Sequence, residues 1–271
     1  MLAGLNAFAA RLVDGLLFAF RDWPPLAGLT VASLLAAVMM LVVVRATSDQ
    51  AAVRAVKRSM RACLLEVRLF NDDFRAMLRA LVELFGHSAA YLRLSIVPAA
   101  CLMLPLSLAV AQMHSRYGYT GLNPGQQALV KVRMNGQPAA DPVLEVPQGL
   151  RIQTPAVSIP SLGEIVWRVS AEEAGDYAVQ LHVDDATFSK SVTVSSAVVS
   201  RSPVRARGLA ARFLYPAERP LPANRLVDAI EVTYPRREIR AFGWDIHWMA
   251  VFFGLSTAFA FAMRRLFGVT L

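Results

Sequence analysis

The chain has 271 residues, of which 55% are hydrophobic and only 18% are charged. With a mean hydropathy of +0.43, it is too apolar for an ordinary water-soluble enzyme of this length, so we expect lipid to solvate part of it. The formal net charge of +8 is spread over several segments that mostly border apolar runs, which favours a membrane surface over nucleic acid as the partner.

Residues 1–25 predict an amphipathic helix that lies in the membrane interface. Arg11 and Asp14 stand in the middle of this segment, where a spanning helix would bury them at about 5 to 7 kcal/mol, against about 4 to 5 kcal/mol gained by the apolar side chains. A fourth span is therefore the weaker alternative. We expect the helix to end before Pro24 and Pro25, with Trp23 as an interface anchor. The large apolar residues recur at helical spacing: Leu2, Leu5, Phe8, Leu12, Leu16 and Phe20.

Three apolar runs, at 26–44, 89–112 and 246–263, predict transmembrane helices because each is close to the ~20 helical residues that cross a hydrocarbon core of ~30 Å. Nine cations against five carboxylates lie at 45–93, and Arg264 and Arg265 follow the third run. Short cytoplasmic segments carry such an excess of positive charge. We therefore expect a cytoplasmic tail at 264–271 and an external N-terminus, in an inner (cytoplasmic) membrane. Trp244 and Trp248 would mark the outer interface.

The cytoplasmic segment 45–88 predicts a basic helical hairpin. Thr47, Ser48 and Asp49 offer N-cap groups for its first helix, and Asn71, Asp72 and Asp73 make a turn and cap the second, which is expected to close near Gly86. Each helix has an apolar stripe, which packs on the other or serves as a docking face. The stripes comprise Val53, Val56, Met60, Cys63, Leu64, Val67 and Phe70 in the first helix, and Phe74, Met77, Leu78, Leu81, Leu84 and Phe85 in the second.

This layout resembles the Oxa/YidC insertase superfamily, and most closely its small three-span branch, which includes the archaeal YidC-like proteins and the insertase subunit of the ER membrane protein complex. The likeness covers about 26–112 and 246–265, includes Pro98 and Pro105 in the second span, and rests on order and topology without a specific motif. Members of that superfamily insert weakly hydrophobic segments through a polar groove open to the cytoplasm, often with a positive residue in it. The resemblance therefore implies nascent chains as partners.

Few polar residues can line such a groove. Arg45 is the only candidate for the positive residue, and it lies at the end of its span instead of within it. Hydroxyl groups in membrane helices usually bond their own helix or a neighbour, which gives these positions a structural alternative. The candidate groove residues are Arg45, Ser107, Gln112, Ser256 and Thr257.

The segment 113–199 predicts an extracytoplasmic β-sandwich. Short alternating strands are expected at 128–134, 143–146, 150–153, 165–170, 177–183 and 188–194, separated by turn residues. Residues 173–177, Glu-Ala-Gly-Asp-Tyr, are similar to the tyrosine corner of immunoglobulin-like folds, in which Tyr177 bonds the backbone upstream and Gly175 lies in the turn. Val179 stands where an immunoglobulin has its second cysteine, and Trp167 lies too close to the corner to be the strand C tryptophan. We expect an Ig-like sandwich without a disulfide.

The segment 200–245 predicts an Arg- and Pro-rich connector that lies on anionic lipid, binds an acidic partner, or is a solvated flank. A short hairpin is expected in it, pairing 230–234 with 238–242 across Pro235. Trp244 follows at the predicted outer interface.

Catalytic patterns are missing from the sequence, so we expect a protein that is not an enzyme and has no cofactor, metal or nucleic acid. The four histidines are isolated, the two cysteines have no metal-ligand spacing, and no nucleophile elbow or phosphate loop occurs. Two functions remain open. One is an insertase-like factor for membrane-protein biogenesis, and the other is a structural or adaptor subunit of an envelope complex.

Overall fold

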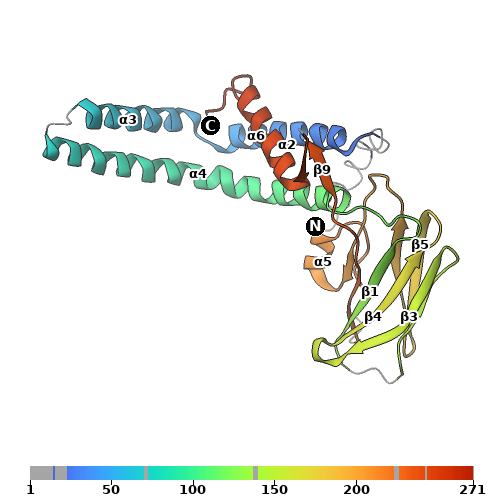
Figure 1. Cartoon of the computed structure of the whole chain (residues 1–271). Helices are drawn as coiled ribbons and strands as arrows, with labels where there is room; N and C mark the ends of the chain where they lie inside the picture. The colour runs from blue at the N-terminus through green and yellow to red at the C-terminus, as the bar shows by residue number, and fades with distance from the viewer. Residues whose placement is uncertain are drawn as a thin grey trace. The chain divides into compact units, whose positions relative to one another are not determined.

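The computed structural model describes residues 15, 23–69, 73–136, 140–222, 226–241 and 243–270. The predicted interfacial helix at 1–25 lies almost wholly outside these residues. The described chain mixes helices and antiparallel strands (Figure 1). It divides into two compact units, one holding Met1–Gly28 and Leu108–Val251 and the other Leu29–Ser107 and Phe252–Leu271.

Two helices are long and apolar enough to cross a membrane, α2 (Pro25–Thr47) and α4 (Phe74–Tyr117). The third apolar run forms α6 (Trp248–Met263), whose 16 residues give about 24 Å of helix, short of a ~30 Å hydrocarbon core. The helix begins later than the predicted 246 because the two preceding residues belong to a strand, β10 (Trp244–His247). The third run is thus apolar but shorter than predicted.

Helix α4 is a single helix of 44 residues, about 66 Å long at 1.5 Å per residue. The prediction that the second hairpin helix closes near Gly86 is wrong. A glycine ends a helix when it adopts a left-handed conformation, and Gly86 is not among the described glycines with positive φ. Pro98 and Pro105 also lie inside the helix. The hairpin arm and the second apolar run are therefore continuous.

The two N-cap predictions hold. Asp49 Oδ1 accepts the backbone N–H groups of Ala51 and Ala52, both at 3.0 Å, at the start of α3 (Gln50–Leu69). Asp73 Oδ1 accepts the N–H group of Arg75 at 2.9 Å at the start of α4. Each carboxylate satisfies N–H groups that the first helical turn leaves without a partner.

Within the helical unit, α3 runs beside the first half of α4 (Figure 1), and Lys57 Nζ lies 5.2 Å from the centre of the Tyr91 ring. The C-terminal segment folds back after α6, where the Thr270 N–H group donates to Gln50 Oε1 at 2.8 Å. A small core forms between α2, α6 and this segment, comprising Ala37, Leu41, Ala260 and Val269.

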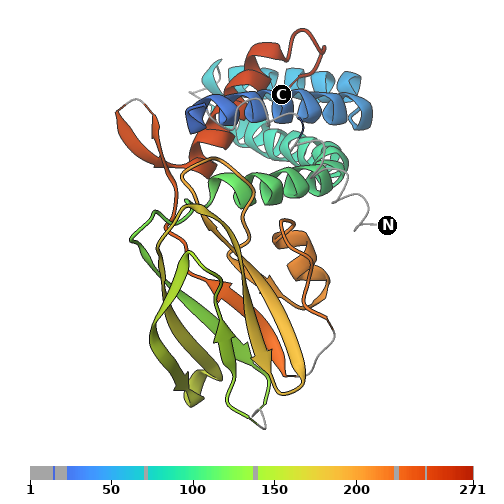
Figure 2. The same ribbon diagram turned by 90° about the vertical axis from the view of Figure 1, so that its right-hand side faces the viewer.

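The described residues of the other unit form two larger antiparallel sheets (Figure 2) and the two-stranded pair of β9 (Glu238–Ala241) and β10. The first has the order β3-β4-β1-β8-β7 and the second the order β2-β5-β6. The strands are β1 (Gln127–Met134), β2 (Val143–Glu145), β3 (Leu150–Ile159), β4 (Glu164–Ala171), β5 (Gly175–Val183), β6 (Ala186–Val194), β7 (Val204–Ala206) and β8 (Val227–Val232). A short 3-10 helix, Pro160–Leu162, joins β3 to β4.

Both sheets bury alternate side chains in one shared core. In β1 and β4 the burial pattern has the period of two that a strand with one solvated face requires. Trp167 on β4 is 3% exposed and belongs to this core, which assigns it a packing role. The six strands predicted between 128 and 194 all form; five differ from the prediction by a few residues at their ends, and β3, predicted at 150–153, continues to Ile159.

The segment after residue 199 is not an extended linker. It forms β7, α5 (Gly208–Leu214) and β8, and β8 pairs with both β1 and β7. The predicted hairpin between 230–234 and 238–242 is wrong, because β9 (Glu238–Ala241) pairs with β10 instead. Strand β8 has a more favourable place in the large sheet, where Ile230 and Val232 are buried in the core.

Candidate functional site

The predicted groove residues are dispersed in the described structure. Arg45 is exposed on the last turn of α2, and Thr257 is exposed on α6. Ser107 is also exposed, and its hydroxyl donates to Leu104 O of its own helix at 2.9 Å. Gln112 is 2% exposed and belongs to the other unit. These positions do not form one polar surface within the described residues.

Ser256 is a buried hydroxyl in the helical unit, and the structure adds a second residue like it. Ser33 on α2 is fully buried and Ser256 on α6 is 8% exposed. Neither hydroxyl has a hydrogen-bond partner among the described residues, which costs free energy in an apolar setting. Ser33 was not predicted, although Thr30 and Ser33 are the two hydroxyl residues of the 26–44 run, which was a signal that could have identified it.

The three predicted tryptophan anchors differ in exposure. Trp23 is 58% exposed and Trp244 is 75% exposed, as an interface anchor requires. Trp248 is fully buried instead, with its ring 5.9 Å from the rings of both His114 and His247. Its role is therefore to pack the start of α6 against the end of α4, and the interface prediction for Trp248 is wrong.

The predicted tyrosine corner has the expected hydrogen bond. The Tyr177 hydroxyl on β5 donates to Glu173 O at 3.1 Å. The ring lies over Gly149, which has a φ of +98°, and a Cβ atom on Gly149 would overlap the ring. Glycine is thus required at 149 both by conformation and by space. A Cβ atom on Gly175 would lie 3.1 Å from the same ring.

Three arginines that are almost wholly buried gather where α4 ends and the β-sheet unit begins. Arg116, Arg201 and Arg237 are 6%, 2% and 7% exposed. Arg201 donates to Ser195 O at 3.0 Å, to Ala197 O at 2.6 Å and to Tyr119 O at 3.4 Å. We call this region, residues 114–122, 195–201 and 234–237, the arginine joint.

Arg237 donates to two of the carbonyl oxygens that Arg201 also contacts. It donates to Tyr119 O at 3.3 Å and to Ala197 O at 3.4 Å. No carboxylate lies within ion-pair distance of Arg201 or Arg237 among the described residues. Burial, followed by the repulsion of Arg237, lowers the pKa of Arg201 to about 10. Tyr234 and Asp176 oppose this lowering of the pKa, so the Arg201 guanidinium group is charged at neutral pH, and backbone carbonyl oxygens accept its hydrogen bonds.

Backbone hydrogen bonds join the same three segments. The Thr120 N–H group donates to Pro235 O at 2.9 Å, the Arg237 N–H group to Gly118 O at 3.1 Å, and the Arg201 N–H group to Ser115 O at 2.7 Å. A Cβ atom on Gly121 would overlap Ser195 O, so the segments approach as closely as glycine permits. The last turns of α4 are thereby fixed to the β-sheets that follow them.

A buried ion pair holds the segment after β7 against β6. Lys190 on β6 is 1% exposed, and its Nζ donates to Glu218 Oε2 at 2.5 Å and to Ser202 O at 2.6 Å. Glu218 Oε1 accepts the Ser191 N–H group at 2.7 Å and the Ser191 hydroxyl at 2.6 Å. Burial lowers the pKa of Lys190, and Glu218 opposes that change. The pair explains why the connector is ordered.

The arginines predicted for the connector are therefore engaged. Arg205 donates to Ser189 O and to Arg219 O, and Arg207 pairs with Asp228. Arg201 belongs to the arginine joint. These contacts argue against one of the three predicted alternatives for this segment, namely that it is a solvated flank.

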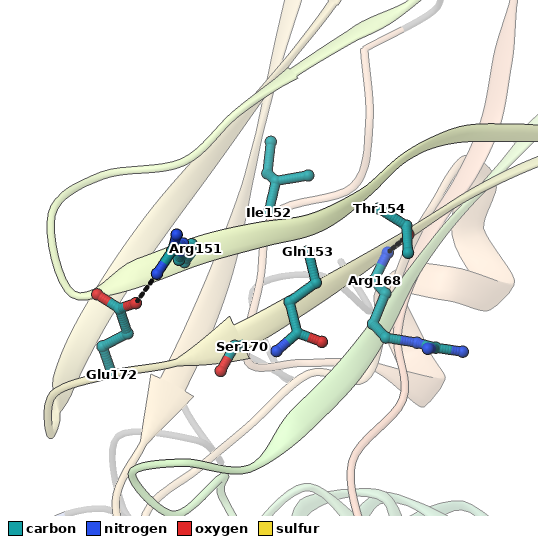
Figure 3. Close-up of a pocket in the computed structure, with 7 residues that line it drawn as sticks. All are labelled: Arg151, Ile152, Gln153, Thr154, Arg168, Ser170 and Glu172. Atoms are coloured by element: carbon teal, nitrogen blue, oxygen red, sulfur yellow. Dashed lines mark hydrogen bonds and ion pairs between the residues drawn. The ribbon is translucent and has the colours of Figure 1, made fainter.

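A shallow depression lies on the outer surface of β3 and β4 (Figure 3). The register of the two strands shifts between Ile152 and Thr154, and the Thr154 hydroxyl accepts the Arg168 N–H group at 3.2 Å. Arg151 and Glu172 pair across its rim at 3.8 Å. Such a β-bulge explains the depression without a bound ligand.

No group of three or more histidine, cysteine, aspartate or glutamate side chains in the described ranges is placed to hold a metal ion. No protein-family model, no curated protein and no solved structure matches the chain.

Proposed function

We propose that the protein is a membrane adaptor subunit, which holds a β-sandwich on the outer face of an inner membrane and a helical hairpin on the cytoplasmic face. The arginine joint is the observation that carries this proposal. Buried charges and close backbone contacts at the end of α4 serve to fix a domain in place, whereas the groove residues that an insertase needs are dispersed.

The proposal includes three membrane spans with the N-terminus outside and the C-terminus in the cytoplasm. The lengths and hydropathy of α2 and α4 support the first two crossings. The third crossing is proposed over the run 246–263, of which α6 forms all but the first two residues, and Arg264 and Arg265 directly follow Met263. The distribution of arginines supports the orientation.

The outer domain is proposed to be Ig-like. Immunoglobulin-type sandwiches have the strand orders ABED and CFG in their two sheets. The neighbours β1-β4-β3 and β2-β5-β6 follow the orders BED and CFG, and β8 takes the place beside β1 that strand A occupies. The hydrogen bond of Tyr177 at the start of β5 supports the same assignment, since the tyrosine corner lies at strand F. Such domains more often bind partners than catalyse.

An insertase-like function is the second candidate, and one observation favours it. Only 11% of the most apolar stretch of α4 is buried inside the structure. Ile96 and Met103 in this helix are 63% and 72% exposed. A hydrophobic segment in transit could pack on that surface. The buried hydroxyls of Ser33 and Ser256 would add polar groups at membrane depth.

Site-specific photocrosslinking in cells separates the two functions. A photoreactive residue is placed at Met103 on α4 or at Val143 on β2, which is 60% exposed, and cells are pulse-labelled before irradiation. The adaptor proposal expects mature proteins of fixed size to be captured from Val143 at all chase times. Capture of short-lived nascent chains from Met103, with nothing from Val143, would support the insertase instead.

The topology is tested with single cysteines at positions 60 and 160 in a chain whose native cysteines are replaced. Membrane-impermeant maleimide applied to intact cells or spheroplasts is expected to label position 160 and not position 60. The reverse labelling would contradict the proposed orientation.

A further inference from the structure

The first three turns of α4 carry an apolar stripe that nothing in the described structure covers. Phe74, Leu78, Val82 and Phe85 are 69%, 50%, 65% and 75% exposed. Their spacing of four, four and three residues places them on one face of the helix. We call these four residues the outer stripe.

A different face of α4 meets α3. Ala80 is 4% exposed, and the Lys57 ammonium group lies over the Tyr91 ring. Ala80 and Tyr91 lie well over 90° around the helix from the outer stripe. The sequence predicted one apolar stripe on this helix, but the structure divides those side chains between two faces. The hairpin therefore closes without using the outer stripe.

The bilayer is too far away to cover the start of the stripe. Phe74 precedes the predicted span, which begins at Ala89, by 15 residues of continuous helix, about 22 Å. Even with a tilt of about 40°, the Phe74 backbone stays about 17 Å from the hydrocarbon. The head-group layer is only about 5 to 7 Å thick on each side, so Phe74 and Leu78 lie beyond it.

The charges beside the stripe identify the kind of partner. Arg75 and Arg79 line a depression together with Leu78, Val82 and Glu83, and neither arginine has a carboxylate within ion-pair distance among the described residues. A second copy of this chain would place arginines against arginines, which costs free energy. A partner with carboxylates along one edge of an apolar surface would complement them.

We propose that the outer stripe binds an amphipathic helix of a cytoplasmic protein partner, with the apolar face of that helix on Phe74, Leu78, Val82 and Phe85 and its acidic edge on Arg75 and Arg79. This binding mode lays an apolar helix face on anchors spaced by three and four residues. The inference deepens the adaptor function and rests on the cytoplasmic position of the hairpin.

The test uses the full chain in nanodiscs of phosphatidylcholine and two synthetic helical peptides of about 18 residues. Both peptides have the same leucine face, and one has glutamates along its edge where the other has lysines. Binding is measured by fluorescence anisotropy. We expect the acidic peptide to bind at least tenfold more tightly than the basic one, and Arg75→Glu with Arg79→Glu to reverse that preference.

Matched variants assign the binding to the stripe. The pair Leu78→Ser and Val82→Ser is expected to weaken binding of the acidic peptide at least tenfold. The pair Leu162→Ser and Val157→Ser removes the same side chains from exposed positions in the β-sheet unit, where they are 62% and 53% exposed. This control is expected to leave binding unchanged. Equal binding of both peptides, or equal losses in both pairs of variants, would overturn the proposal.

The other occupants are tested in the same nanodiscs. An environment-sensitive dye at Leu78→Cys, with the native cysteines replaced, is expected to report water until the acidic peptide is added. A lipid-like signal without peptide, or chemical crosslinks between two copies through this position, would overturn the proposal in favour of lipid or self-association. These outcomes are independent of the crosslinks from Val143, which test the adaptor function itself.

Discussion

Arg201 and Arg237 donate hydrogen bonds to the same two carbonyl oxygens, Tyr119 O and Ala197 O. Two like charges thus share their acceptors at a site where both side chains are at least nine-tenths buried. This arrangement is stable only because the carbonyl dipoles of two loops converge on it. The two arginines join the chain after α4 to two loops that lie about 80 and 115 residues further along. In this respect they differ from ordinary surface cations, which contribute little to stability.

Replacing these arginines is expected to destabilise the β-sheet unit by unequal amounts. Arg201→Met should cost about 2 to 3 kcal/mol, because Ser195 O loses the donor Arg201 and Ala197 O loses its short hydrogen bond to the same guanidinium group. Arg237→Met should cost about 1 kcal/mol, since its hydrogen bonds are longer. The double variant should cost more than the sum, because either single substitution already relieves the repulsion, and only the double variant removes both donors from Tyr119 O and Ala197 O. Thermal unfolding of the purified full chain in detergent, with hydrogen exchange of strand peptides, measures these changes.

Arg168→Met is the control, because Arg168 is exposed on β4 and its replacement should change stability by less than about 0.5 kcal/mol. If Arg201→Met unfolds at the same temperature as the unmodified protein, the arginine joint does not hold the unit together.

The tyrosine corner gives a second prediction, which separates conformational strain from steric overlap. Gly149→Ala introduces both a Cβ atom at positive φ and an overlap with Tyr177. Gly125→Ala introduces only the first, because Gly125 has a φ of +85° and nothing lies within 4 Å of its Cβ position. We expect Gly125→Ala to cost about 1 to 2 kcal/mol and Gly149→Ala clearly more.

In the background of Tyr177→Ala, the cost of Gly149→Ala should fall to that of Gly125→Ala, because the ring is gone. Tyr177→Phe alone should cost about 1 kcal/mol for the lost bond to Glu173 O. Chemical denaturation of the full chain, followed by hydrogen exchange in β5, measures each of these variants. An unchanged cost of Gly149→Ala without the ring would show that the overlap is not the cause.

The difference between the predicted and the observed structure follows from how local each signal is. The tyrosine corner lies within five residues and was predicted correctly, as were the caps Asp49 and Asp73. The place of β8 could not be read in this way, because Val232 pairs with Val130, more than 100 residues earlier. Two alternating segments on either side of Pro235 satisfied every local rule for a hairpin.

The candidate site was less predictable than the strands for the same reason. A run with Arg201, Arg205 and Arg207 has the composition of a solvated flank. The burial of Arg201 arises only when three distant segments meet around it. Gly86 shows the converse case: glycine suggests a helix end, but the flanking apolar residues continue with helical period and the helix continues with them.

Continuity of α4 through Gly86 predicts a defined distance. Spin labels at the native Cys101, which is exposed, and at Arg79→Cys, in a Cys63→Ser background, are separated by 22 residues. An unbroken helix gives about 33 Å between their backbones, which pulsed electron paramagnetic resonance measures in nanodiscs. A hinge near Gly86 would give a shorter or broader distribution. Gly86→Ala should leave the distance unchanged and stabilise the helix slightly, since nothing lies near its Cβ position.

The buried pair of Lys190 and Glu218 predicts a dependence of stability on pH. Burial lowers the pKa of Lys190 from its ordinary value of 10.5. Between the lowered pKa and 10.5, the unfolded chain binds a proton that the folded chain does not, so stability rises with pH across that window. Glu218 narrows the window by stabilising the charged ammonium group.

Glu218→Gln should therefore lower the pKa of Lys190 further, which extends the pH window to lower pH. It should also cost about 3 to 5 kcal/mol of folding stability at neutral pH, because a buried charge loses its partner. Its unfolding temperature should rise as the pH is raised from 7 toward 10, while that of the unmodified protein changes less. Adding Lys190→Met to Glu218→Gln should remove this rise and restore much of the lost stability, since no charge is then buried. If Glu218→Gln shows no rise with pH, Lys190 is not the group whose charge the glutamate stabilises.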